Sequence, residues 1–380
     1  MSKNWNMEKP AIAFRSRYDH WYVIAVLLLV GVGIVTLYSA SYAFAERFFH
    51  DRWYFIVRQT VYAALGLIAF FIVSWFPLEK IRGVIMPLVL FTMFLCLLTF
   101  VPAIGVMKNG ASRWIRIGPW TYQPSELVKL VLPLYLAHIF DKKKDSLDSF
   151  ARGILPPAVV TVIFFVLIYC QNNFSMAVFI AVNALVLFFL AGIKMSYFAG
   201  TAVMILPVSL LLILTKEHRL RRVLSFIWPE WEPLGAGYQV RSSILTIRSG
   251  GFWGKGIGQG TRKIASVPEI QSDFIFASYA EEAGFIGIIL FLVLIAVFAI
   301  RAIDAALKTA DTFKRLLAMG LGTTILSQTV VNIAVVSGSI PTTGIPLPFF
   351  SAGGSALTTT LVMAGLIANV GKSEAPNDRG

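Results

Sequence analysis

The sequence predicts an all-α polytopic membrane protein with about ten transmembrane helices. Of its 380 residues, 57% are hydrophobic and 14% are charged, and the mean hydropathy is +0.73. A soluble domain carries about 25% charged residues to cover its surface, so the apolar excess has to face lipid. The net charge is +13, but the basic residues lie between apolar runs, where they set orientation and contact anionic lipid. We therefore expect the lipid bilayer, and no nucleic acid, as a partner.

Apolar runs long enough to span a bilayer place the helices. They cover residues 20–42, 54–76, 84–104, 122–140, 153–170, 174–192, 196–215, 274–300, 315–337 and 354–371. The first run is too long for a signal peptide and more spans follow, so we expect it to stay uncleaved. The fourth is the weakest, because Glu126 and Lys129 lie within it.

We expect a single membrane domain over residues 20–371, with cytoplasmic tails at 1–19 and 372–380. Lysine and arginine in short loops predict the orientation. With the N-terminus inside, cytoplasmic segments hold 17 such residues and short outer loops hold five. Loop 105–121, the long segment 216–272 and loop 338–353 then all emerge on the outer side, which we expect to be the working side.

Several common chemistries have no signal in the sequence. Cys96 and Cys170 lie in or beside apolar runs, and the four histidines are scattered without ligand spacing. A disulfide framework and a zinc site are therefore not expected. The sequence also has no HExxH or CxxC motif and no visible Ser/His/Asp arrangement.

A first group of chemistry-bearing residues lies in GASRWIRIGPWTYQPSELVKL, residues 110–130. Pro124 suits the first turn of a helix, so Glu126 and Lys129 share one helix face about one turn inside the outer membrane surface. Placing an ionisable residue within a span costs at least ~2.5 kcal/mol, which favours a functional role. The alternative is a mutual ion pair that only locks two spans together.

A second group lies in SVPEIQSDFIFASYAEEAGFIG, residues 266–287. Asp273 stands where the long outer segment enters the eighth span. Glu281 and Glu282 follow, roughly 12 Å deeper at 1.5 Å per residue. A lone acid at a helix start is also explained by the helix dipole, but two more acids further along favour a function.

The third group is the segment SGSIPTTGIPLPFFSAGGSA, residues 337–356. Its prolines and glycines forbid a regular helix, yet the segment is apolar. Irregular apolar backbone beside a bilayer is tolerated only where protein or a water-filled cavity surrounds it. We therefore predict a re-entrant loop at 338–353 that lines an outer cavity. An ordinary exposed hairpin is the alternative.

The long outer segment contains two basic stretches. KEHRLRRVLSFIW, residues 216–228, is typical of a basic amphipathic helix on the membrane surface, and it equally suits a phosphate-bearing lipid headgroup. GGFWGKGIGQGTRK, residues 250–263, lacks the P-loop pattern. Its glycines, with Lys255, Arg262 and Lys263, can still bring backbone N–H groups and cations to a phosphate. The whole outer inventory suits a base that works beside an anionic, phosphorylated lipid.

In order and spacing these motifs resemble the SEDS family of bacterial polymerases of shape, elongation, division and sporulation, typified by FtsW and RodA. The likeness covers nearly the whole chain. It rests on GASRWI…QPSELVKL, GAGYQ…SGGFWGKGIGQG, PEIQSDFIFA…EEAGFIG and N…PTTGIPLPFFSAGGS, with NGASRW and SDFIFASYAEEAGF slightly closer to FtsW. The chain departs from the family where Asn172 and Asn173 follow Gln171 in place of Pro-Asp, where Arg241 replaces a common Gln, and where Ala352 replaces the usual Tyr.

The resemblance implies a peptidoglycan glycosyltransferase of the inner membrane, acting in cell division or elongation. It would polymerise lipid II outside the membrane onto a glycan linked to undecaprenyl pyrophosphate. The family's essential acid falls on Asp273, the expected general base, and its functionally important Glu and Lys fall on Glu126 and Lys129. The motifs also contain these substrate-binding or supporting residues: Arg113, Gln123, Ser125, Lys255, Gln259, Glu281, Glu282, Asn332, Pro341, Thr343, Gly344, Pro346, Ser351, Gly353, Gly354 and Ser355.

The resemblance makes no cofactor certain. A divalent cation, Mg or Mn, near Asp273 or Glu126 would offset the charge of the leaving pyrophosphate. The expected protein partners are a class B penicillin-binding protein, which is a transpeptidase, and other division or elongation proteins.

Two other function classes stay open. A lipid II flippase would use Glu126, Lys129, Glu281 and Glu282 to line a headgroup pathway, and a scaffold would only recruit a partner. A flippase needs charged positions that reach the inner leaflet. The charged positions of this chain cluster outside or mid-membrane, which favours the enzyme.

Overall fold

The computed structural model describes residues 19–372, apart from 109, 119, 229–234 and 261–269. Each of the ten predicted spans is a helix. They are α1 (His20–Phe49), α2 (Tyr54–Trp75), α3 (Leu78–Leu98), α4 (Pro124–Lys142), α5 (Leu155–Cys170), α6 (Phe174–Leu190), α7 (Met195–Leu214), α11 (Ile275–Lys308), α12 (Thr312–Val336) and α13 (Gly354–Val370). Among the described residues, six helices are long and apolar enough to cross a membrane by length and composition. The predicted multi-pass helical membrane fold is confirmed.

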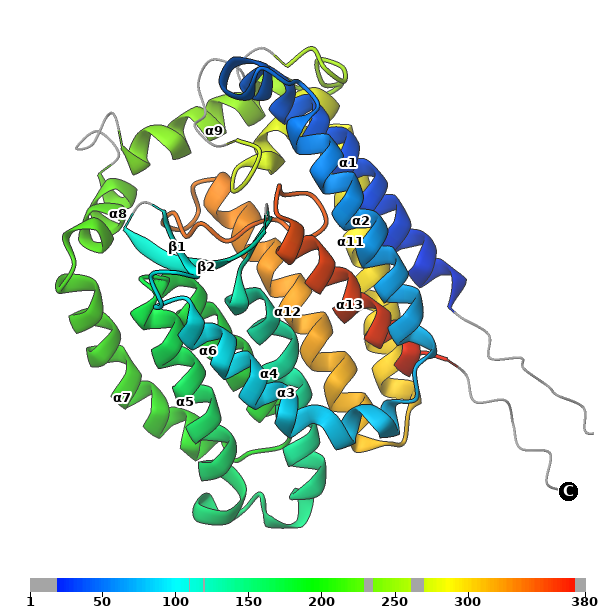
Figure 1. The fold of residues 1–380 in the computed structure, drawn as a ribbon, viewed down its shortest axis with the longest axis vertical. Coiled ribbons are helices and arrows are strands. Elements are labelled where there is room, and N and C mark those ends of the chain that lie inside the picture. The colour runs from blue at the N-terminus through cyan, green and yellow to red at the C-terminus, as the bar shows by residue number, and fades with distance from the viewer. Residues whose placement is uncertain (1–18, 109, 119, 229–234, 261–269, 373–380) are drawn as a thin grey trace, which may run out of the picture.

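The helices pack around α4 and α12. Most residues of α4 are buried, Glu126 and Lys129 among them. In Figure 1, α1, α2, α11 and α13 form one flank, where α13 packs on α2 and α1 packs on α11. On the other flank α5 packs against α6. The outward faces of peripheral helices such as α3 expose large apolar side chains, including Leu90 and Phe94, which is the surface that lipid covers.

Ion pairs join the connecting loops at the end of the bundle where α1 begins. Arg82 contacts Asp141 at 2.9 Å and Asp311 at 2.8 Å, and Lys194 contacts Asp148 at 2.9 Å. The opposite end carries α8 (Glu217–Ile227) and α9 (Ala236–Gly250), two helices of the long segment. Loops that are far apart in sequence therefore meet at the same end of the molecule.

The stretch between α3 and α4 forms a small sheet that the sequence analysis treated as a plain loop. Strands β1 (Gly105–Lys108), β2 (Ala111–Ile117) and β3 (Trp120–Tyr122) pair antiparallel in the order β1-β2-β3. The predicted third span was therefore too long at its far end, since α3 stops at Leu98. Gly105 packs against the end of α3, where an added Cβ would lie 2.2 Å from the Thr99 carbonyl oxygen.

Helix α11 folds back on itself at Gly284, whose φ of 65° is outside the helical region. The rings of Phe276 and Phe291 lie 5.5 Å apart, and the Tyr279 hydroxyl donates to the Gly287 carbonyl at 2.7 Å. A continuous helix would separate the two phenylalanines by about 22 Å. The first part of α11 therefore runs toward the end that carries α9, and the second part returns through the bundle. The prediction that Glu281 and Glu282 lie deeper in the bundle than Asp273 is wrong, because this reversal places them nearer the end that carries α9.

Residues 337–353 form the predicted re-entrant loop, and the exposed-hairpin alternative is wrong. Ile345, Leu347, Phe349 and Phe350 are buried. The Phe349 carbonyl would lie 2.4 Å from a Cβ on Gly33, a residue in the middle of α1, so the loop reaches well into the bundle. Its irregular backbone is bonded by buried amides. Gln328 donates to the Pro346 carbonyl at 2.7 Å, and Gln59 donates to the Ser351 carbonyl at 3.0 Å.

Candidate functional site

A cavity of about 1090 Å³ opens between the sheet, α8, the start of α4 and the re-entrant loop. It is the meeting point of segments from nearly the whole chain, because its walls also include α1, α2 and the turn between α5 and α6. The following predicted site residues line it: Asp273, Glu126, Arg113, Gln123, Thr343, Gly344, Pro346, Gly353, Gly354 and Ser355. The first and third motif groups of the sequence therefore share one space with Asp273 of the second group.

Asp273 lies on the turn that precedes α11, and its backbone is fixed to two other elements. The Asn332 side chain donates to the Asp273 carbonyl at 2.8 Å and to the Ile345 carbonyl at 2.9 Å. The Ala352 amide donates to the Gln271 carbonyl at 2.9 Å. Gly344 lies beside the carboxylate, since a Cβ there would be 3.4 Å from Asp273 Oδ2. One buried amide on α12 thus couples the acid to the re-entrant loop.

Two arginines from separate elements share the electrostatic environment of Asp273. Burial lowers the pKa of Arg113 on β2, and Arg222 lowers this pKa further, while the Asp273 carboxylate opposes the shift. Burial likewise lowers the pKa of Arg222 on α8, and Asp273 again opposes it. Lys216 also lines the cavity. This part of the cavity therefore holds more positive than negative charge, which suits an anionic ligand.

The Gln171-Asn172-Asn173 segment, which departs from the family pattern, supports the sheet. Asn172 has φ 57°, a conformation that asparagine tolerates better than most residues. Its side chain donates to the Gly110 carbonyl at 2.9 Å, and its own carbonyl accepts from Arg113. Asn172 and Asn173 also line the cavity. In this chain the segment positions an arginine and supplies neutral polar groups.

Glu126 and Lys129 form the ion pair that the sequence left as an alternative. Their Oε2 and Nζ atoms are 2.6 Å apart, with both side chains at most 1% exposed. Lys129 also donates to Gln328 Oε1 at 2.7 Å, and the same glutamine holds Pro346 in the re-entrant loop. Glu126 lines the large cavity, whereas Lys129 does not. The pair therefore connects the cavity wall to the loop.

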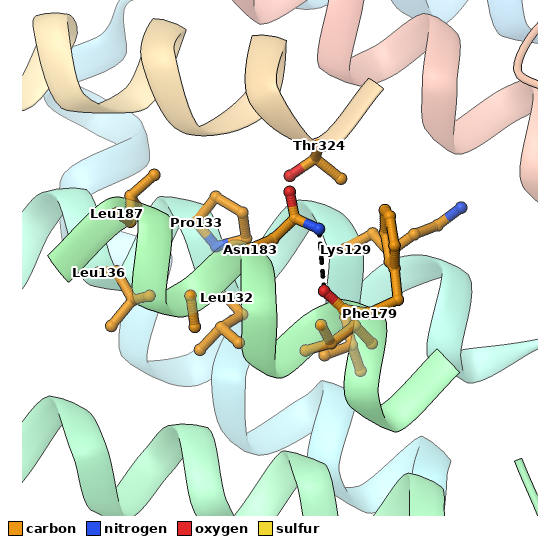
Figure 2. A pocket seen from close by; sticks show the side chains of 11 residues that line it. Lys129, Leu132, Pro133, Leu136, Phe179, Asn183, Leu187 and Thr324 are labelled. Atoms are coloured by element: carbon orange, nitrogen blue, oxygen red, sulfur yellow. Dashed lines mark hydrogen bonds between the residues drawn. The ribbon is translucent and has the colours of Figure 1, made fainter. Parts of the chain in front are cut away.

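Below Lys129 the space between α4, α6 and α12 is nearly closed. A crevice of about 10 Å³ remains there, and this volume holds about one water molecule. Figure 2 shows Lys129 extending away from Leu132, Pro133 and Leu136, which line this crevice together with Asn183 and Thr324. Most of the lining residues in this part of the described chain are apolar, and the space is too small for a charged headgroup.

The glycine-rich segment and the two glutamates contact each other, and they do not line the large cavity. Glu281 accepts from Lys255 at 3.2 Å and from Ser249 at 3.1 Å, and Glu282 accepts from Ser39 at 2.5 Å and from the Gly258 amide at 3.1 Å. The Gly258 amide is therefore not free to bind a phosphate, because Glu282 accepts its one N–H, while the Lys255 ammonium spends one of its three donors on Glu281. Gln259 also lies outside the cavity, and Arg262 and Lys263 lie outside the described residues.

The remaining predicted residues act as supports or lie elsewhere. Buried Ser125 accepts from Gln123 at 2.9 Å, and Ser351 accepts from the Leu347 amide at 2.8 Å. Asn332 carries the coupling described above. Pro341 lines a second cavity beside α9. Ser351 and Asn332 therefore shape the site by holding the backbone of the re-entrant loop.

Sequence reasoning missed an aromatic wall from α1 and α2. Phe44, Phe49, Tyr54 and Phe55 line the cavity, and Arg58 lies 4.2 Å from the centre of the Tyr54 ring. Aromatic residues at span ends are typical of membrane-interface belts. Their pattern in the sequence therefore did not distinguish a cavity wall from a lipid-facing belt.

Two carboxylates, Asp273 and Glu126, line the described part of the cavity, and they have different partners. Glu126 is paired with a buried lysine. No three His, Cys, Asp or Glu side chains gather anywhere in the described residues. Asp273 is therefore the candidate for an acid that acts on a bound molecule.

Comparison with known proteins agrees with this geometry. Residues 19–375 match the FtsW/RodA/SpoVE family, described as cell cycle proteins. The probable peptidoglycan glycosyltransferase FtsW of a Geobacter species (strain M18) is 37% identical over 353 residues, which cover 93% of this chain and 96% of that protein. Stage V sporulation protein E of Bacillus subtilis is 36% identical over 356 residues, covering 92% and 96%.

Solved structures share the fold. A chain of a peptidoglycan synthase complex, described as coordinating polymerization and crosslinking, superposes with a TM-score of 0.77 at 29% identity, covering 93% of this chain and 97% of that one. The rod shape determining protein RodA of Thermus thermophilus superposes with a TM-score of 0.66 at 27% identity, covering 93% and 96%.

Proposed function

The chain belongs to the FtsW/RodA/SpoVE family of cell cycle proteins, and we propose that it polymerises lipid II into the glycan strands of peptidoglycan. The observation that carries this proposal is the position of Asp273. Its carboxylate lines the cavity next to Gly344 of the re-entrant loop, and two arginines from β2 and α8 share its surroundings. Relatives at 36–37% identity, one of them named as a probable peptidoglycan glycosyltransferase, support the same activity.

The reaction requires one base and a stabilised leaving group. The 4-hydroxyl of an incoming lipid II sugar attacks the anomeric carbon of the growing glycan, and the bond from that carbon to the diphosphate oxygen breaks. Asp273 takes the hydroxyl proton, while the undecaprenyl diphosphate departs with the bonding electron pair. Displacement inverts the anomeric centre once, so the step needs no covalent enzyme intermediate.

The arginines fit the charge that develops on the leaving group. Arg113 and Arg222 come from different elements, so their relative positions depend on the tertiary fold. Cations fixed in this way stabilise the diphosphate as its negative charge grows, at little reorganisation cost. Lys216, at the start of α8, adds a third cation to the cavity lining.

A divalent cation is compatible with these residues. Mg²⁺ is commonly held by one or two carboxylates together with substrate phosphates. Asp273, whose carboxylate lines the cavity, would hold such a cation together with the substrate diphosphate. When bound, the cation would supply further charge neutralisation at the diphosphate.

The geometry favours a polymerase over a flippase. A flippase needs a polar path for the headgroup to the other leaflet. In the described chain the cavity is bounded by the Glu126–Lys129 pair, and the crevice below it is mostly apolar and about 10 Å³ in volume. The acids Glu281 and Glu282 lie nearer the outer end and bind the glycine-rich segment.

We place the cavity on the outer face of the cytoplasmic membrane and the termini in the cytoplasm. The bias of 17 basic residues against five supports this orientation. The outer face has no nucleotide supply, which fits a donor that is already activated by diphosphate. We further propose a class B penicillin-binding protein as partner and the division septum as the site of action, which the likeness to a peptidoglycan synthase complex and to FtsW proteins supports.

The test is polymerisation by the purified protein. Labelled lipid II is supplied to the full chain in lipid nanodiscs, with and without a candidate transpeptidase, and the products are resolved by length. We expect glycan chains that a muramidase degrades. Lipid II that remains monomeric with every candidate partner, while moving between leaflets of proteoliposomes, would instead assign the flippase function.

A further inference from the structure

A second cavity, of about 580 Å³, lies between α8, α9 and the first residues of the re-entrant segment. Three arginines line it: Arg222 from α8, and Arg241 and Arg248 from α9. Among the described residues that line it, none is acidic. Nothing in the proposed reaction uses Arg241 or Arg248, so their convergence on one space calls for its own explanation.

The two α9 arginines belong to one face of that helix. They are seven residues apart, with Ile244 and Leu245 between them on the cavity side. Among the described residues no ion pair within 4 Å engages Arg222, Arg241 or Arg248, and Arg222 contacts the Thr342 carbonyl only at 3.4 Å. A concave surface with three converging guanidinium groups is a recognised arrangement for phosphate.

The rim of this cavity is apolar and exposed. Trp228 is 60% exposed, Ile227 53% and Leu245 39%. These side chains come from α8, the basic amphipathic helix, and from α9, at the end of the bundle where the membrane surface is expected. A site that combines phosphate-binding cations with an apolar rim suits a ligand that carries both a phosphate and a hydrocarbon chain.

We propose that the α8–α9 cavity is a second binding site, which takes the phosphate group of a lipid. The guanidinium groups of Arg241 and Arg248 hold the phosphate, and the hydrocarbon chain lies along Ile227 and Trp228. Arg222 lines both this cavity and the one containing Asp273, so an occupant here neighbours the reaction site. A role in delivering or receiving the lipid carrier rests on the proposed function, whereas the binding itself does not.

The experiment labels the site without turnover. The probe is farnesyl diphosphate with a photoreactive diazirine in its chain, and its match is farnesol with the same diazirine. The full chain in nanodiscs of neutral lipid is irradiated with each probe, and labelled peptides are located by mass spectrometry. The compared proteins are the parent, the double variant Arg241→Gln with Arg248→Gln, and the control Arg221→Gln. Arg221 is on α8, pairs with Glu217 at 2.6 Å and is not a lining residue.

We expect the diphosphate probe to label residues 225–245 in the parent and in Arg221→Gln. The double variant removes two charge-assisted donors to the phosphate, so it should reduce this labelling by at least about tenfold. Labelling of the Asp273 cavity, read at peptides that contain Tyr62 or Trp120, should stay within about twofold. The proposal would be overturned if the farnesol probe labelled 225–245 as strongly as the diphosphate probe does. Equal labelling of the double variant and the parent by the diphosphate probe would overturn it as well.

Competition identifies the source of the lipid phosphate. Unlabelled undecaprenyl diphosphate should displace the probe from 225–245. If phosphatidylglycerol does not displace the probe, the site is assigned to the polyprenyl carrier. Equal displacement by phosphatidylglycerol assigns it to bilayer phospholipid, and either result supports a lipid-phosphate site. Asp273→Asn protein should retain the labelling. A parent that labels at 225–245 but forms no glycan would reject the proposed function and leave this site in place.

Discussion

At the scale of single residues, the acid at 273 is defined by how its backbone is held. Asn332 and the re-entrant loop fix the position of the turn, and the loop places a glycine beside the carboxylate, where a side chain would make contact. Arg113 and Arg222 add positive charge from outside the turn. The chemistry assigned to Asp273 therefore depends on residues from β2, α8, α12 and the loop.

Asp273→Asn should nearly abolish polymerisation while the protein still folds. The amide keeps the size of the side chain but cannot take a proton. General base catalysis contributes about 10²–10⁴-fold, and we expect a loss of this order in glycan formation from labelled lipid II at saturating partner. Thermal unfolding in detergent serves as the folding control. Activity within about threefold of the parent would reject Asp273 as the base.

Arg113→Gln should lower polymerase activity by about tenfold to a hundredfold, because a guanidinium that faces the anionic part of the substrate contributes a charge-assisted bond. Arg116→Gln is the matched control. It lies on the same strand, three positions away and therefore on the opposite face, and it is exposed outside the cavity. Initial rates across a range of lipid II concentrations separate the two variants. Equal rates for them would show that Arg113 contributes only as part of the general positive charge.

At the scale of elements, α4 and α12 hold the re-entrant loop through a chain of side chains. Glu126 pairs with Lys129, Lys129 donates to Gln328, and Gln328 donates to Pro346. Because Lys129 occupies the amide oxygen, the amide nitrogen of Gln328 faces the loop. The ion pair lies within α4, and the bond from Lys129 to Gln328 is what joins α4 to α12. This bond fixes which end of the glutamine points toward the cavity.

Gln328→Leu should lower polymerase activity more than the loss of a comparable hydrogen bond elsewhere on α12 does. It removes the bond to Pro346 and leaves Lys129 with one acceptor fewer, which costs about 1–3 kcal/mol. Ser327→Ala is the control, because it removes a bond of 2.8 Å to Asn183 that does not involve the loop. Both variants are measured for unfolding temperature and for glycan formation. Similar activities at similar stability would contradict a positioning role for Gln328.

The reversal of α11 depends on Gly284. Its φ of 65° is unfavourable for other residues, and an added Cβ would lie 2.1 Å from the Gly254 nitrogen. Gly284→Ala should therefore destabilise the protein by more than about 1–3 kcal/mol, measured as a lower unfolding temperature in detergent. Gly31→Ala, on an open face of α1, should leave that temperature unchanged or raise it. Equal temperatures for the two variants would contradict the fold-back.

At the scale of the whole molecule, the arrangement of charge predicts which end faces the cytoplasm. Ser149→Cys and Ile257→Cys place single thiols at opposite ends, in a background where Cys96 and Cys170 are replaced. Ser149 is exposed beside α5, and Ile257 is 72% exposed in the glycine-rich segment. In intact spheroplasts an impermeant maleimide should label only the thiol at 257. Labelling only at 149 would invert the topology and move the cavity to the cytoplasmic side.

The sequence by itself determined the helical membrane class, the positions of the spans and the motifs that meet in the cavity. Apolar runs have the length of a bilayer crossing whatever their neighbours are, so α2, α6 and α12 could be placed within a few residues of their observed bounds. Pro124 likewise predicted the start of α4, because proline fits the first turn of any helix. The apolar Pro/Gly composition of 338–353 predicted a re-entrant loop, since lipid does not tolerate unpaired backbone.

Only the tertiary structure decided what the charged residues contact. Spacing along one helix gave Glu281 and Glu282 a depth below Asp273, but the reversal at Gly284 carries them to the end of the bundle near α9, where Lys255 and Gly258 bind them. The sequence alone is compatible with Arg222 as an exposed surface charge. Its place in the walls of two cavities follows from how α8 packs. A local pattern reports the face and the rise of one element. Contacts between distant elements depend on how the chain turns between them. Here the non-helical backbone of one residue, Gly284, reverses the chain and changes those contacts.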